Sequence, residues 1–121
     1  MKRNMKQWVA ETIANPVKKG VPVLSFPAVQ LMDITVRDLI SSSDLQAKGM
    51  KMVADKVNSG ASVSLMDLSV EAECFGSTIR VTDDEVPTVI GAVVSDEDAA
   101  DALVVPEVGV CRTGLYIEAI A

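Results

Sequence analysis

One aspartate stands where a side chain could do chemistry. Asp67 closes the short apolar run SVSLMD at 62–67, and a helical pattern begins almost directly after it, at Ser69. A carboxylate in such a place can accept several N–H hydrogen bonds and stabilise positive charge on a bound molecule. The same side chain can instead brace the loop or cap the helix that follows. Asp67 is therefore the candidate catalytic residue, with a structural role as the open alternative.

The chain contains no histidine. This excludes Ser–His and Cys–His pairs and removes the commonest zinc ligand. The two cysteines, Cys74 and Cys111, stand 37 positions apart, a separation that fits no familiar metal-binding spacing. Both lie among apolar neighbours in predicted helices. We therefore expect reduced, buried thiols, with no metal and no cofactor held by this chain.

Other charged side chains carry weaker signals. Glu71 and Glu73 fall on opposite sides of a short predicted helix, so they make a poor acid–base pair and are expected to be solvated or to stabilise the helix dipole. The run Asp83–Glu85 lacks the alternating spacing of a calcium loop, which favours a solvated turn over a cation site. Arg112 is an isolated cation in an acidic region, where a salt bridge is its expected role.

Charge and hydropathy restrict the partners. Residues 1–60 sum to +4 and residues 61–121 to −10, so the net charge is −6. A chain this acidic repels phosphate backbones, so nucleic-acid binding is not expected. No apolar stretch approaches the roughly 20 residues of a membrane helix, and the first residues lack the apolar region of a secretory signal. A cytoplasmic protein without membrane contact is expected.

The elements that must position Asp67 alternate between helix and strand. We expect a first helix ending near Asn15, a strand over 21–26, a helical unit over 29–41, a helix opened by a capping box at 43–46, and a strand over 62–67. After Asp67 we expect a short helix over 69–76, a hairpin or extended excursion over 77–94, a helix opened by the acids at 95–98, and a last helix from Pro106. Two strands separated by helical crossovers imply parallel βα units.

A family resemblance rests on the motif around Asp67. The stretch MDLSVEAECFG at 66–76 resembles the uroporphyrinogen decarboxylase superfamily, and specifically its branch of methylcobalamin:coenzyme M methyltransferase-like proteins. Supporting segments are VPV at 21–23, DEVPTV at 84–89, VPEV at 105–108 and RTGLY at 112–116. Their order and spacing extend the likeness over nearly all of residues 15–121.

The resemblance implies an α/β fold of a particular kind. Family members are (β/α)8 TIM barrels, which typically need about 250 residues. Residues 1–121 would then be a single N-terminal fragment, about a third of a barrel, with the first two βα units, an N-terminal helix and a β-hairpin excursion. Asp67 would lie at the carboxyl end of a barrel strand, the end that carries active sites. In the decarboxylases the matching aspartate binds the pyrrole N–H groups of the substrate.

One departure favours the methyltransferase branch. The decarboxylases carry an arginine-rich loop after the first strand, whereas residues 25–32 here contain no arginine. The methyltransferases activate a thiol such as coenzyme M on zinc held by His and Cys ligands in their C-terminal half, and they take the methyl group from methylcobalamin. A corrinoid protein would be a partner of the full-length protein. Residues 1–121 alone are expected to be inactive.

Two alternatives stay open. The chain could be a non-catalytic, stand-alone module for oligomerisation or partner binding, or a fragment of a true uroporphyrinogen decarboxylase of porphyrin biosynthesis. Parallel strands cut from a barrel leave open edges and an uncovered apolar face. We therefore expect a homo-oligomer that covers the exposed strand edges.

Overall fold

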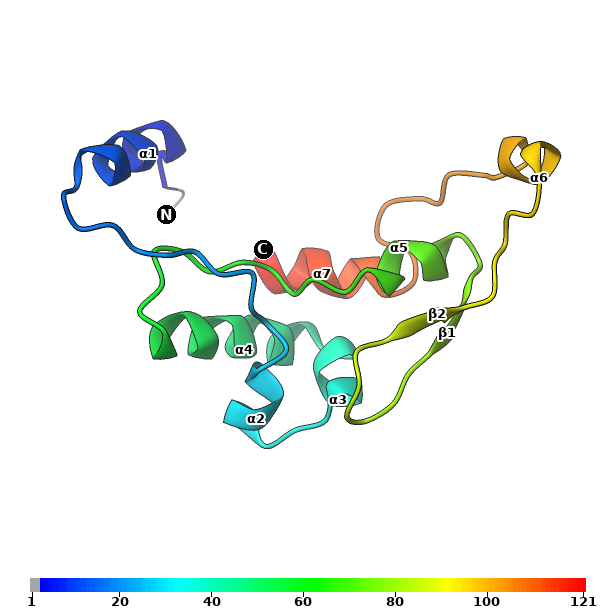
Figure 1. Cartoon of the computed structure of the whole chain (residues 1–121), viewed down its shortest axis with the longest axis horizontal. Helices are drawn as coiled ribbons and strands as arrows, with labels where there is room; N and C mark the ends of the chain where they lie inside the picture. The colour runs from blue at the N-terminus through cyan, green and yellow to red at the C-terminus, as the bar shows by residue number, and fades with distance from the viewer. Residues whose placement is uncertain (1–2) are drawn as a thin grey trace.

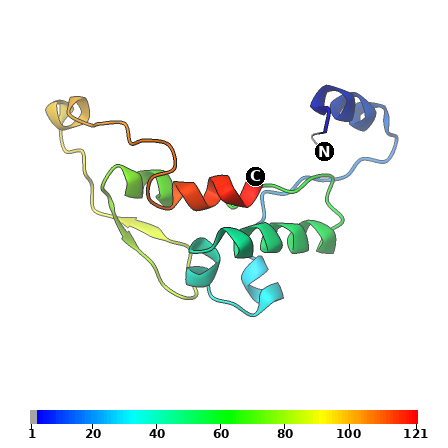
Figure 2. The ribbon, with the colours of Figure 1, turned by 180° about the vertical axis from the view of Figure 1, so that it is seen from behind.

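The structure is a computed structural model that describes residues 3–121; Met1 and Lys2 lie outside the described residues. Helices and a small sheet alternate along the chain (Figure 1), in the order α1 Met5–Ala14, α2 Ala28–Met32, α3 Val36–Ile40, α4 Ser43–Lys56, α5 Ser69–Cys74, β1 Thr78–Arg80, β2 Thr88–Ile90, α6 Glu97–Asp101 and α7 Thr113–Ile120. The expected mixed α/β character is confirmed. The arrangement is open: α1 and α6 lie at opposite ends, and α4 and α7 lie between them (Figures 1 and 2).

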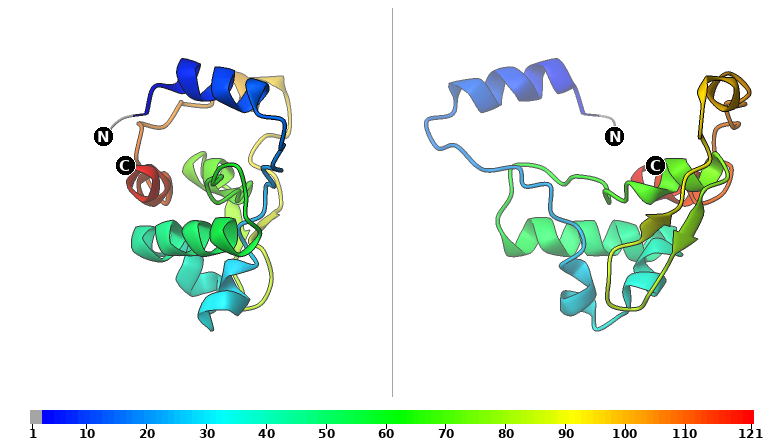
Figure 3. Two further views of the ribbon diagram at one scale, coloured as in Figure 1. Left: turned by 90° about the vertical axis from the view of Figure 1, so that its left-hand side faces the viewer. Right: turned by 45° about the vertical axis from the view of Figure 1, so that its right-hand side comes forward.

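The buried core lies where α2 and α3 pack against α4. Its side chains are apolar and come from these three helices and from the 62–67 segment; they are Ala28, Val36, Leu39, Ile40, Val53 and Leu65. Gly49 of α4 allows the close approach of α2, because a Cβ at this position would lie 2.7 Å from the Cβ of Ala28. On its other side α4 contacts α7, and Figure 3 shows the two helices one above the other.

The two expected strands over 21–26 and 62–67 are absent as strands, which corrects the sequence prediction. The segments do run side by side in the same direction (Figure 1): Gly60 N–H donates to Gly20 C=O at 2.9 Å, and Ser25 Oγ donates to Ser64 C=O at 3.3 Å. Parallel pairing is stable when both faces of the sheet are covered. Here Val21 and Val23 stay exposed and Pro22 has no N–H to donate, so no ladder forms.

The hairpin expected over 77–94 is confirmed. Strands β1 and β2 pair antiparallel, with Thr78 opposite Ile90 and Arg80 opposite Thr88. The connection between them reaches back to α3, where Val36 N–H donates to Asp83 C=O at 2.8 Å and Arg37 Nε donates to Asp83 Oδ1 at 2.9 Å. The hairpin is thereby tied to the core, although its own residues are largely exposed.

Local signals gave several helix bounds correctly. Helix α1 ends at Ala14, before Asn15 and Pro16, and α5 is followed by Gly76 with a φ of 93°, a value that favours glycine. Helix α6 begins after Asp96, whose side chain accepts a hydrogen bond from Ala99 N–H at 2.8 Å. These bounds depend on residues within one turn of the helix end.

Three helix predictions are wrong in part. The unit expected over 29–41 is two helices, because Asp33 takes a left-handed conformation (φ 54°) and Thr35 then caps α3 in a capping box with Asp38. The cap of α4 is Ser42 rather than Ser43. The last helix begins at Thr113, not at Pro106, because residues 108–112 turn back toward α5.

Helix α1 has no packing partner within residues 3–121. It buries none of its residues, and it stands away from the rest of the chain (Figures 1 and 3). Every helix in this described part is too short or too polar to cross a lipid bilayer.

Candidate functional site

Both carboxylate oxygens of Asp67 accept hydrogen bonds, from the start of α5 and from residues at the start of α7. Its Oδ1 accepts from Ser69 N–H at 2.9 Å and from Ser69 Oγ at 2.6 Å, which braces the start of α5. Its Oδ2 accepts from Arg112 Nη1 at 2.5 Å and from Tyr116 OH at 3.1 Å. The Asp67 side chain is 0% exposed. The structural role that the sequence left open is therefore present.

Arg112 connects three side chains around this carboxylate. Besides its bond to Asp67, it donates from Nε to Glu73 Oε2 at 2.6 Å and from Nη2 to Ser69 Oγ at 2.9 Å. The guanidinium thus uses all three nitrogens, in the fork geometry that suits paired carboxylates. It joins the turn before α7 to both ends of α5. The salt bridge expected for Arg112 is confirmed.

The electrostatics keep the network in one protonation state. Burial by itself would raise the pKa of Asp67, but the hydrogen bonds from Ser69 and Arg112 outweigh it, and the pKa lies below the ordinary value. Burial, the Asp67 charge and the hydrogen bond to Asp67 raise the pKa of Tyr116 far above its ordinary value. Burial lowers the pKa of Arg112, but Asp67 and Glu73 more than compensate. At neutral pH the site holds an aspartate anion, an arginine cation and a neutral phenol.

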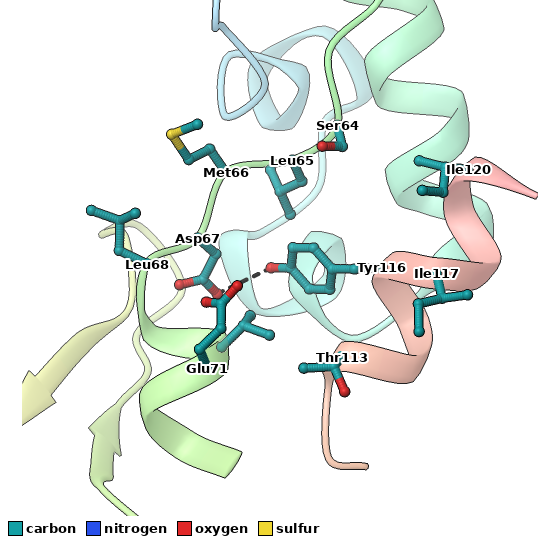
Figure 4. A pocket seen from close by; sticks show the side chains of 11 residues that line it. Ser64, Leu65, Met66, Asp67, Leu68, Glu71, Thr113, Tyr116, Ile117 and Ile120 are labelled. Carbon is teal, nitrogen blue, oxygen red and sulfur yellow. Dashed lines mark hydrogen bonds between the residues drawn. The ribbon is translucent and has the colours of Figure 1, made fainter. Parts of the chain in front are cut away.

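A cavity of about 430 Å³ opens beside this network. Figure 4 shows the 64–68 segment and α5 on one side and α7 on the other, with Asp67 and Tyr116 joined across it. Most of the lining is apolar, from Leu65, Met66, Leu68, Val70, Ile117 and Ile120. Buried Asp67 and half-buried Tyr116 bring polar groups to this lining, while Glu71 at its edge is exposed. The cavity suits an apolar ring or chain with a polar end near Asp67.

The Asp67 carboxylate has no acceptor position left free. Two oxygens offer about four lone-pair directions, and Ser69, Arg112 and Tyr116 occupy four of them. A ligand N–H reaches Asp67 only when Tyr116 or Arg112 moves away. In this arrangement the carboxylate orders α5 and α7 and is not positioned to take a proton.

The predictions for the other charged residues and for the cysteines are confirmed in part. Glu71 is exposed, as expected, whereas Glu73 is half-buried and paired with Arg112, so Glu73 is not a solvated side chain. The acids of the hairpin turn are exposed, with Asp83 paired to Arg37 and Glu85 to Arg80. The cysteine prediction is also wrong in part: Cys111 is exposed and lies on a turn, and Cys74 is half-buried at the end of α5.

Sequence reasoning missed Tyr116 and Ser69 as members of the site. Arg112 and Tyr116 are four positions apart, a spacing that places side chains on one helix face, so this pair could have been found. No sequence signal shows that this face packs against Asp67, because Arg112 and Tyr116 lie 45 or more positions after Asp67.

No group of three or more His, Cys, Asp or Glu side chains that could hold a metal ion occurs within residues 3–121. Comparisons of the chain with protein-family models, with curated proteins and with solved structures found no match.

Proposed function

We propose that this chain forms the first part of a (β/α)8 barrel of the uroporphyrinogen decarboxylase superfamily, in its corrinoid-dependent methyltransferase branch. One observation supports this most directly. The 20–25 and 60–64 segments run in the same direction, separated by α2, α3 and α4, and the second continues to buried Asp67 beside a cavity. In a (β/α)8 barrel, two successive βα units run in the same direction in this way, and active-site residues lie at the carboxyl ends of their strands.

The choice of branch rests on the segment after the first extended run. Residues 25–32 form a tight turn and α2, with Ala28 buried against α4. No arginine is present there to bind the carboxylates of a porphyrinogen. A fragment of a true decarboxylase is the weaker proposal for this reason.

The residues of this chain do not fit a zinc site. The chain has no histidine, and within residues 3–121 no cluster of potential ligands forms. In this proposal zinc, methylcobalamin and a corrinoid protein belong to the full-length protein. What this chain contributes is one wall of the pocket, with Asp67 held in place by Arg112.

The test begins with the gene beyond codon 121. We expect an open frame that continues into further βα units and His and Cys ligands, and we expect the protein made from it to demethylate methylcobalamin in the presence of coenzyme M. Residues 1–121 alone should leave the methylcobalamin absorption spectrum unchanged. Turnover by residues 1–121 alone would contradict the proposal. So would a longer protein that neither binds zinc nor transfers the methyl group.

A second candidate function is a stand-alone association module. It is favoured by the large apolar side chains left exposed at both ends and along the extended segments, among them Ile13, Val23, Leu68, Val104 and Val108. Surfaces of this kind are normally covered by another chain. We expect sedimentation velocity at micromolar concentration to show a homo-oligomer of residues 1–121. A stop directly after codon 121, with a folded oligomer, would favour this candidate over the first.

A further inference from the structure

The two cysteines, far apart in the sequence, lie next to each other in the structure. Cys74 Sγ donates to the C=O of Val110, the residue before Cys111, at 3.3 Å. On the other side, the neighbours Glu73 and Arg112 form an ion pair with 2.6 Å between Nε and Oε2. Contacts on both sides of Cys111 therefore bring the end of α5 against the turn that carries it.

The turn around Cys111 is held in a defined shape. Cys111 has a φ of 50°, in the left-handed region, and Val110 C=O accepts from Thr113 N–H at 3.2 Å as well as from Cys74. Cys111 is exposed and Cys74 is half-buried. An external reagent can thus reach the Cys111 thiol more readily than the Cys74 thiol.

The surroundings also favour the thiol form of Cys111 over its thiolate at neutral pH. A hydrogen bond with Cys74 raises the pKa of Cys111, and the negative charge of Glu73 raises it further, while Arg112 opposes them. Thiol–disulfide exchange begins from the thiolate, so the exchange will be slow at neutral pH and will depend on how closely the two sulfurs are held.

We propose that Cys74 and Cys111 form a reversible intramolecular disulfide that fastens the turn before α7 to the end of α5. The oxidant is a small-molecule disulfide such as glutathione disulfide. The Cys111 thiolate attacks one of its sulfurs, which forms a mixed disulfide and releases one glutathione thiolate. Cys74 then attacks the Cys111 sulfur and releases the second. Two electrons pass from the protein to the oxidant, and the two protons of the cysteines end on the released glutathione.

The disulfide would have a direct effect on the site around Asp67. It would join the residues that flank Glu73 and Arg112, so the turn could no longer move Arg112 away from Asp67 and Glu73. The reduced protein would allow that movement. The disulfide would therefore hold Arg112 in its contacts with Asp67 and Glu73, and would fix the wall of the cavity that α7 forms.

The experiment equilibrates residues 1–121 with reduced and oxidised glutathione, traps free thiols by acid and alkylation, and maps peptides without reduction. We expect the mass of a single chain that has lost two hydrogen atoms, with the peptide of Cys74 linked to that of Cys111 within the same chain. The glutathione ratio at half-oxidation should correspond to an effective concentration at least about tenfold higher in native buffer than in urea, because the native contacts hold the sulfurs together.

Two variants serve as controls. Cys74→Ser and Cys111→Ser should each lose the internal link and keep one thiol that forms a mixed disulfide with glutathione. The proposal is overturned if the wild-type chain ends as glutathione adducts or as disulfide-linked dimers. It is also overturned if the effective concentration is the same in urea. Peptide mapping of the wild-type chain decides this even where a variant fails to fold, and its outcome is independent of methyl transfer.

Discussion

At the scale of single residues, the molecule is organised around one buried carboxylate. Asp67 has four hydrogen-bond donors around it, and three of them come through Arg112 and Ser69, which contact each other as well. Such a network is costly to leave half-satisfied, because each remaining polar group has already lost its water. Loss of the Arg112 side chain would leave the largest number of polar groups without a partner, because it donates to Asp67, Glu73 and Ser69.

Replacing Arg112 by alanine should destabilise the chain strongly. Asp67 and Glu73 would remain close together without their cation, and loss of one partner of a buried pair typically costs about 3–5 kcal/mol. Because Arg112 and Glu73 keep some exposure, we expect roughly 3 kcal/mol in the free energy of unfolding, measured by urea denaturation followed by circular dichroism.

Arg80→Ala is the matched control for that substitution. The Arg80–Glu85 pair has 3.4 Å between Nη2 and Oε2, and both side chains are more than half exposed. An exposed pair contributes about 0–1 kcal/mol, so this variant should resemble the wild type. Equal losses for the two variants would mean that the Asp67 network does not stabilise the fold.

The same carboxylate predicts a pH dependence. The pKa of Asp67 is lowered on folding from its ordinary value of 3.8, because the hydrogen bonds from Ser69 and Arg112 outweigh the effect of burial. As the pH falls past that value, the unfolded chain takes up the proton first. The stabilisation is therefore complete at higher pH and is lost progressively below 3.8, as the pH falls toward the folded pKa.

Asp67→Asn isolates this contribution. The difference in unfolding free energy between wild type and variant should be constant from neutral pH to about pH 5 and should shrink below about pH 4. The measurement is a series of urea titrations at different pH values. A difference that grows as the solution is acidified would contradict the direction of the Asp67 shift.

At the scale of elements, helix packing depends on one close approach. A Cβ on Gly49 of α4 would lie 2.7 Å from the Cβ of Ala28, and both atoms are fixed by their backbones. Gly49→Ala should therefore push α2 away from α4. The cost of overpacking is about 1–3 kcal/mol, partly offset by the better helix propensity of alanine. Thermal unfolding would measure the resulting fall in Tm.

Gly20→Ala is the control at this scale. A Cβ at Gly20 would meet nothing within 4 Å, so alanine should leave the stability unchanged or raise it slightly through the lower entropy of the unfolded chain. A fall in Tm as large as that of Gly49→Ala would show that the close approach of α2 and α4 is not what matters.

The elements also show where sequence reasoning worked. Helix α1, helix α6 and the hairpin follow from signals within a few residues, such as the stop before Pro16 and the cap at Asp96. The break at Asp33 was missed although its signal is local, since Thr35 and Asp38 form a capping box three residues apart. The late start of α7 did not follow from the sequence, because it depends on distant contacts. Residues 108–112 form a turn instead of a helix, and in this turn Val110 contacts Cys74 and Arg112 pairs with Glu73. No local sequence pattern predicts these contacts, which override the local helix propensity.

At the scale of the whole molecule, burial is uneven, so protection of backbone amides from hydrogen exchange should be uneven as well. Helix α4 buries Gln46, Gly49, Met50 and Val53, whereas α1 and α6 bury nothing. Amide groups exchange hydrogen slowly where opening requires loss of packed contacts. We expect the centre of α4 to exchange at least about tenfold more slowly than α1 when measured by mass spectrometry on the dilute protein.

The dependence of that exchange on protein concentration tests the homo-oligomer. If a second copy covers the apolar side chains Met5, Val9 and Ile13 of α1, exchange in α1 should slow as the concentration rises, while exchange in α4 should stay the same. Equal protection of α1 and α4 at every concentration would contradict the packing described here.

The sequence by itself determined helix α1, helix α6 and the hairpin, the mixed α/β character, the position of Asp67 just before a helix and the two possible roles of that residue. Those features depend on capping, proline and hydrophobic periodicity, which act within a few residues. Only the tertiary structure decided that Arg112, Tyr116 and Ser69 surround Asp67, that Cys74 contacts the turn that carries Cys111, and that the two extended segments lie parallel without forming a sheet. The physical reason is that each of these features depends on contacts between residues tens of positions apart in the sequence. Such contacts form only when the chain folds and buries one surface against another.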